Sequence, residues 1–298
     1  MLTVLAAIEQ ASARLESAGV CFGHGTTNAF DEAAWLVLWR LGLPLDALDE
    51  HAGRPLSDGE AAAVDALVAE RIATRRPAAY LTGEAWLQGV PFTVDERAIV
   101  PRSLIAEPLA DGTIDAWLSA RTHRVLDLCT GNGSLAVLAA LAWPDVTVDA
   151  ADLSADALAV ARLNVDRHGL ADRITLYQGD GLAAVAGRRY DLILCNPPYV
   201  NATSMAALPA EFRAEPALAL DGNTRGGTDG MDFIRMLLRD AAAAMANDAV
   251  LVLEIGHERD HFEHAFPALE AAWLSTSAGD DQVLLLTRGA LVDFFQTP

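Results

Sequence analysis

The chain has 298 residues, 52% of them hydrophobic, and a formal net charge of −20 at pH 7. All 21 basic residues are arginines, so Schiff-base and lysine-base mechanisms are excluded. An acidic protein of this kind lacks the clustered basic surface that a long nucleic acid needs, but it can attract a basic protein partner.

Length and composition also limit the class of protein. The length predicts about two domains, and no apolar run reaches the roughly 18 residues of a membrane helix. The N-terminus lacks the basic region of a signal peptide. Three cysteines without paired spacing are typical of a reduced, cytoplasmic protein, which is what we expect here.

Residues 1–83 are expected to form a small helical bundle. Residues 2–18 and 29–41 are rich in Ala and Leu and stop at Gly19 and Gly42. A capping box at residues 57–60 opens a third helix, which Pro77 ends. Nothing in this part carries chemistry, so we interpret it as a substrate-docking domain.

Residues 84–112 change character and are interpreted as a β-hairpin linker with a connecting helix. The β-formers Trp86, Phe92, Ile99 and Val100 are interrupted by Gly89, which favours a hairpin. Residues 101–103 are expected to close it and to open a helix that runs to about residue 120.

Residues 113–298 alternate between strand and helix patterns and are predicted to be the catalytic domain. Strands are expected at 125–128, 146–150, 174–177, 190–195, 249–255 and 283–286, with a helical stretch before the last strand. Such alternation predicts an α/β fold with a doubly wound, mostly parallel sheet.

The stretch Asn196-Pro197-Pro198-Tyr199 follows the apolar strand at 190–195, where open α/β sheets place their chemistry. The two prolines fix the backbone and remove two amide donors. The Asn196 side chain adds an acceptor that cannot ionise at pH 7. Stiffly held acceptors suit a planar NH2 group, against which Tyr199 can lie flat. A proline turn that only caps the strand is the structural alternative.

A second group of residues predicts a nucleoside site. Residues 127–133 place glycines where the first strand turns into its helix, although Ala136 replaces the third glycine of a dinucleotide fingerprint. Asp152 comes nineteen residues after Gly133, the place for a carboxylate that holds ribose hydroxyls. With Asp127 and Asp180, three acids at successive strand ends suit a nucleoside ligand that carries a cationic centre.

These residues together resemble the class I methyltransferases that use S-adenosylmethionine and, more narrowly, the HemK-type N(5)-glutamine protein methyltransferases. The likeness rests on residues 99–103, 127–133, 152, 180 and 196–199 and covers nearly the whole chain. Stretches 79–86, 100–107 and 215–220 look like the ribosomal (PrmB-type) branch, which modifies the third large-subunit ribosomal protein. Asn132, Ser134 and a glycine-rich insertion at 223–227 depart from the family pattern and affect the expected substrate fit.

The resemblance implies a Rossmann-like fold, S-adenosylmethionine as cofactor, no metal, and a ribosomal protein as partner. It implies that the Asn196 side chain and the Pro197 carbonyl accept hydrogen bonds from a glutamine NH2, with Tyr199 beside them and no general base. The cofactor-binding residues implied are Phe92, Arg102, Asp127, Cys129, Thr130, Gly131, Asn132, Gly133, Asp152, Asp180 and Asn196.

Four alternatives stay open at this point. The same reaction could act on peptide chain release factors, and N(6)-adenine methyltransferases of nucleic acids share the Asn-Pro-Pro-Tyr sequence. His257-Glu258-Arg259-Asp260-His261 fits the H-E-x-x-H pattern of zinc hydrolases, although a solvated helix start is the simpler reading. A binding module without catalysis is the fourth.

Overall fold

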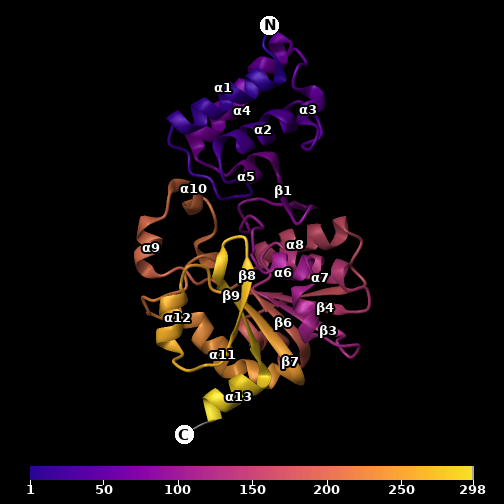
Figure 1. Cartoon of the computed structure of the whole chain (residues 1–298), viewed down its shortest axis with the longest axis vertical. Coiled ribbons are helices and arrows are strands. Elements are labelled where there is room, and N and C mark those ends of the chain that lie inside the picture. The colour runs from indigo at the N-terminus through magenta and orange to yellow at the C-terminus, as the bar shows by residue number, and fades with distance from the viewer. Residues whose placement is uncertain (297–298) are drawn as a thin grey trace.

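The computed structural model describes residues 1–296 and has a helical end and a larger α/β end (Figure 1). The five helices of the helical end are α1 (Val4–Ser17), α2 (Ala29–Arg40), α3 (Leu48–His51), α4 (Asp58–Thr74) and α5 (Ala78–Thr82). The capping box at Ser57 and Glu60 is confirmed. The apolar stripes of α1, α2 and α4 bury Ile8, Val37 and Val68 against one another in a core separate from that of the sheet.

A short hairpin, β1 (Glu84–Leu87) and β2 (Val90–Thr93), follows the helical end. Two predictions for this region were wrong. Ile99 and Val100 lie in a loop, because the Val100 amide donates to the Glu215 carboxylate instead of a strand partner. The expected long helix is replaced by α6 (Ala106–Ala110) and the 3-10 helix η1 (Thr113–Trp117), since Gly112 between them has a φ of 79°.

The α/β end holds a seven-stranded sheet in the order β5-β4-β3-β6-β7-β9-β8. The strands are β3 (Arg124–Leu128), β4 (Thr147–Asp152), β5 (Ile174–Gln178), β6 (Tyr190–Cys195), β7 (Met245–Glu254), β8 (Ala272–Thr276) and β9 (Gly279–Thr287). The first five strands in this order are parallel, whereas β9 runs antiparallel to both β7 and β8. The predicted mostly parallel α/β fold is confirmed, and β8 is a strand that the sequence reading missed.

Side chains alternate between the two faces of the sheet along its central strands, so each face carries apolar side chains and is covered by helices. Leu192 and Leu194 of β6 enter the core under α6, α7 (Ser134–Ala142) and α8 (Ala155–Arg167). Ile193 and Cys195 enter the opposite core. That second core lies under η2 (Gly181–Val185), α11 (Asp232–Ala244), α12 (Arg259–Ala265) and α13 (Arg288–Gln296).

The crossover from β6 to β7 is long and contains α9 (Ala202–Ala207), α10 (Ala210–Arg213) and η3 (Ala217–Ala219) before α11. Figure 1 shows α9 and α10 beside the sheet, with α10 next to the helical end. None of the helices in residues 1–296 has the length and apolarity to cross a membrane.

Candidate active site

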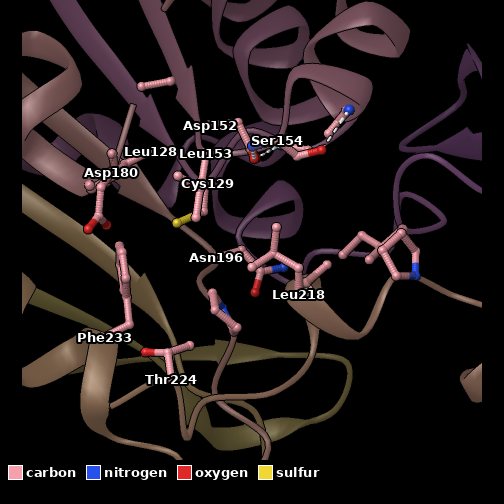
Figure 2. A pocket seen from close by; sticks show the side chains of 18 of the residues that line it. Leu128, Cys129, Asp152, Leu153, Ser154, Asp180, Asn196, Leu218, Thr224 and Phe233 are labelled. Atoms are coloured by element: carbon pink, nitrogen blue, oxygen red, sulfur yellow. Dashed lines mark hydrogen bonds between the residues drawn. The ribbon is translucent and has the colours of Figure 1, made fainter. Parts of the chain in front are cut away.

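A cavity of about 620 Å³ opens at the carboxyl ends of β3, β4, β5 and β6. This size lies within the usual range for small-molecule sites. Figure 2 shows Cys129, Asp152 and Asn196 around this cavity. The residues predicted as site residues that line it are Cys129, Gly131, Asp152, Asp180 and Asn196.

The loop after β3 is built around Asp127, whose side chain is 1% exposed. Its Oδ2 accepts from Thr130 Oγ1 at 2.5 Å and from the Ala136 amide at 2.9 Å. Burial raises the pKa of Asp127 to about 7. Its Oδ1 has no hydrogen-bond partner among the described residues. Asp127 and Thr130 therefore shape the loop from inside and do not line the cavity, unlike the direct contact we predicted.

Asn132 and Gly133 also act within the loop. The Asn132 side chain donates to the Ile99 carbonyl at 2.7 Å and accepts from the Ser134 amide at 3.0 Å. Gly133 has a φ of 81°, and a Cβ there would lie 3.1 Å from Cβ of Ala161 on α8. A glycine is therefore required for α8 to pack this closely.

Gly131 and Asp152 form the wall that faces the cavity. Gly131 has a φ of 56°, and a Cβ there would have no atom within 4 Å. Asp152 accepts from the Gly131 amide at 2.9 Å and from the Ser154 amide at 2.8 Å. Burial raises the pKa of Asp152. Because each carboxylate oxygen has two lone pairs, Asp152 can still accept from hydroxyl groups in the cavity.

The cavity also involves Asp180 and the glycine-rich insertion. The Asp180 side chain is 58% exposed and pairs with Arg225 at 3.5 Å. Thr224 and Arg225, both from the insertion, line the cavity. The insertion that departs from the family pattern therefore forms part of the site.

Asn196 lies at the end of β6 and lines the cavity. Among residues 1–296 no group forms a hydrogen bond with its side-chain amide. A partly exposed amide without an internal partner is free to bind a ligand group. The neighbouring Cys129 remains a neutral thiol, because a hydrogen bond with Cys195 and burial raise its pKa.

Tyr199 is held in place by a buried carboxylate. Its hydroxyl donates to Glu254 Oε1 at 3.1 Å, and burial raises the pKa of both groups. The Glu254 Oε2 accepts from the Ser103 hydroxyl at 2.6 Å and the Leu104 amide at 2.9 Å. A Cβ on Gly256 would lie 2.5 Å from the Tyr199 ring. Glu254 thus ties the loop at 101–104 to the Asn-Pro-Pro-Tyr loop.

Two predicted cofactor residues lie away from the cavity. Phe92 is fully buried in the core, with its ring 5.5 Å from that of His168. Arg102 donates to both carboxylate oxygens of Glu215, at 2.5 and 2.7 Å. Ile99 lines the cavity instead. Pro197 and Tyr199 do not line the cavity surface either.

The sequence reading missed Glu254 and Glu215. The strand-end argument used for Asp127, Asp152 and Asp180 applies equally to Glu254, the last residue of β7, and could have found it. Glu215 was noted only as part of the family-like stretch 215–220, and its structural role was not predicted, because its partners Val100 and Arg102 lie more than a hundred positions away.

The H-E-x-x-H stretch does not form a zinc site. Glu258 is 7% exposed and binds His261 Nδ1 at 2.6 Å and the Asn201 side chain at 2.7 Å. Within residues 1–296 no three His, Cys, Asp or Glu side chains are grouped so that they could hold a metal ion. The stretch is the start of α12.

Known proteins resemble this chain along almost its entire length. The family model "PrmC N-terminal domain" matches residues 6–83, and "Methyltransferase small domain" matches residues 113–223. A ribosomal protein uL3 glutamine methyltransferase of Bordetella pertussis is 54% identical and aligns over 95% of this chain and 94% of that protein. Proteins of the same name from Burkholderia pseudomallei and Neisseria gonorrhoeae are 51% and 46% identical, over 95% and 98% of this chain and 94% and 96% of theirs.

A solved structure, the catalytic domain of hMettl16 in complex with a MAT2A 3'UTR hairpin, is 15% identical with a TM-score of 0.49 and covers 79% of this chain and 84% of that chain.

Proposed function

The chain belongs to the family of ribosomal protein uL3 glutamine methyltransferases, and we propose that its cavity at the strand ends is the site of this reaction. The protein is an S-adenosylmethionine-dependent enzyme that methylates the side-chain amide nitrogen of a glutamine in ribosomal protein uL3. The observation that carries the placement is the Asn196 amide, which lines the cavity and has no hydrogen-bond partner among the described residues.

The residues of the cavity suit S-adenosylmethionine. The Asp152 and Asp180 carboxylates suit ribose hydroxyl and adenine amino groups, and the bare backbone of Gly131 leaves space for a ligand beside them. The sulfonium is a cation, and the cavity lining offers the Asp152 and Asp180 carboxylates to it, together with two guanidinium groups, Arg97 and Arg225. When bound, the cofactor supplies an activated methyl group.

The acceptor is oriented by the chain's own residues. The Asn196 Oδ1 accepts a hydrogen bond from the glutamine NH2 and fixes the direction in which the nitrogen lone pair points. This acceptor interaction strengthens as positive charge develops on nitrogen, which is the kind of stabilisation that contributes most to catalysis. No general base is needed before transfer, because the methylated, positively charged amide loses its proton readily to water.

The acceptor loop is fixed at both ends. Asn196 follows directly on β6, and Tyr199 is held by its hydrogen bond with Glu254. Cavity-lining Pro198 keeps this loop stiff between them. A loop that does not have to reorganise loses little entropy when the glutamine binds.

The wider organisation follows the same proposal. Residues 1–83 dock the protein substrate, residues 84–112 connect the two ends, and residues 113–298 carry the chemistry. The charge of −20 favours a basic ribosomal protein over a nucleic acid as partner, and an enzyme that modifies ribosomal proteins works in the cytoplasm.

The test is methyl transfer from labelled S-adenosylmethionine to purified, unmodified uL3, with release factor and duplex DNA as parallel acceptors. We expect one methyl group on a glutamine side chain of uL3, located by peptide mass mapping. Preferential labelling of the release factor or of DNA adenine would contradict the proposal.

A further inference from the structure

The segment at residues 209–220 contains α10 and η3, and Figure 1 shows α10 next to the helical end. Its second half supplies Pro216, Leu218 and Ala219 to the cavity lining. Figure 2 shows Leu218 and Asn196 facing the same part of the cavity. Whatever fixes this segment therefore also fixes the wall beside the acceptor loop.

Glu211 fixes the first half of the segment to the helical end. Its carboxylate is 2% exposed and accepts from the Cys21 amide at 3.2 Å and from Arg75 at 3.3 Å. Arg71 lies 3.6 Å away and is itself bound to Glu32 at 2.8 Å. All of these partners belong to the part of the chain that holds α1 to α4.

Phe212 adds an apolar contact at the same place. Its ring centroid lies 4.3 Å from that of His24, which is 1% exposed. A Cβ on Gly23 would lie 3.2 Å from the tip of the Phe212 ring, so the loop before α2 fits closely over this side chain.

Glu215 fixes the second half of the segment at a three-way junction. It binds Arg102 with both oxygens, accepts from the Val100 amide at 3.0 Å, and lies 3.3 Å from His24 Nε2. Burial raises the pKa of Glu215, but the Arg102 charge outweighs it and brings the pKa to about 2. Glu215 is therefore ionised, with its charge compensated by Arg102 of the linker, and His24 of the helical end lies beside it.

The segment is connected directly to the acceptor loop. Val200, the residue after Tyr199, donates its amide to the Leu220 carbonyl at 2.9 Å, and its carbonyl accepts from the Gly222 amide at 3.1 Å. This parallel bridge continues the Asn-Pro-Pro-Tyr loop. A displacement of residues 216–220 is therefore transmitted to the loop that carries Asn196.

We propose that Glu211 and Glu215 are positioning residues, through which the helical end holds the acceptor loop in its reactive geometry. The helical end is then part of the catalytic arrangement as well as a docking surface. This inference rests on the proposed function and assigns a role to two buried acids that do not touch the reacting groups.

The test uses Glu211→Gln and Glu215→Gln, which keep the shape and remove the charge. For each variant we would measure the single-turnover rate at saturating uL3, the KM for uL3, and the Kd of S-adenosylmethionine. We expect the single-turnover rate to fall about tenfold to a hundredfold, since a misplacement of about 1 Å can cost that much. The cofactor Kd should change less than about twofold.

The matched control is Asp65→Asn, which removes an ion pair with Arg14 on the exposed surface of the same helical end. It should change none of these quantities. Arg75→Gln provides a milder disturbance if the glutamic acid variants fold poorly, because Arg75 is partly exposed and is only one of the Glu211 partners. It should lower the single-turnover rate severalfold.

Two results would overturn the inference. A raised KM with an unchanged single-turnover rate would mean that the acids serve docking alone. A lowered melting temperature with unchanged kinetics would mean that they serve stability alone. If wild-type protein does not methylate uL3, the proposed function itself fails, which is a different outcome from either of these.

Discussion

Replacing Asn196 with alanine separates catalysis from stability. Among residues 1–296 the Asn196 amide has no hydrogen-bond partner, so Asn196→Ala breaks no internal bond, and we expect the free energy of unfolding to change by less than about 1 kcal/mol. In the reaction, by contrast, the amide oxygen is the side-chain acceptor for the glutamine NH2. Losing one preorganised group of this kind costs about a hundredfold to a thousandfold in rate, equivalent to about 3–4 kcal/mol.

The assay is single-turnover methyl transfer to uL3, measured beside S-adenosylmethionine calorimetry and a denaturant melt. Asn196→Asp extends the test, because it retains an acceptor but adds a charge beside the reacting nitrogen, and it should also transfer slowly. The control is Asn28→Ala, which removes the N-cap of α2. It should cost about 1 kcal/mol of stability and leave the rate unchanged. A near wild-type rate for either Asn196 variant would show that Asn196 only caps β6.

Three further outcomes are expected. Asp152→Ala should weaken S-adenosylmethionine binding by about 1–3 kcal/mol, and an unchanged calorimetric Kd would refute its assignment. The folded-state pKa of Asp127, about 7 against an ordinary 3.8, means that its contribution to stability is full below about pH 4 and is lost as pH rises to about 7. The wild-type free energy of unfolding, measured with urea at several pH values, should therefore fall by on the order of 4 kcal/mol over this range because of Asp127. Asp127→Asn should lack this fall, and parallel curves of unfolding free energy against pH for the two proteins would refute the shift. Gly256→Ala should displace the Tyr199 ring and lower both the melting temperature and the transfer rate, whereas Gly169→Ala, where φ is also positive but no atom lies within 4 Å, should lower only the melting temperature.

The sequence was sufficient for the features that depend on local patterns. The apolar runs of β3 to β7 and the glycines at 131 and 133 follow from periodicity and backbone freedom, and the structure has them where we expected. The prediction of a continuous helix at 101–120 was wrong because Gly112, with a positive φ, interrupts it.

The features that sequence could not supply depend on distant partners. Val100 has the residue type of a strand, but its amide bonds to Glu215, 115 positions away. Phe92 was assigned to the cofactor, yet its ring is buried in the core 5.5 Å from the ring of His168, 76 positions further along the chain. Contacts of this kind depend on how segments that are far apart in the chain pack together, which no window of sequence describes.

The long crossover from β6 to β7 has a consequence for how such enzymes could diversify. Parallel strands need a connection of only about a dozen residues, and α11 is the crossover helix that packs on the sheet, so residues 200–230 are not required to close the fold. They could be exchanged between relatives without disturbing any strand register. Glu211 and Glu215, however, form ion pairs with the arginines at 71, 75 and 102, which lie far away in the chain. A chimera should therefore inherit the crossover, the linker and the helical end from the same parent, because otherwise the two buried acids would face a surface without the arginines that bind them.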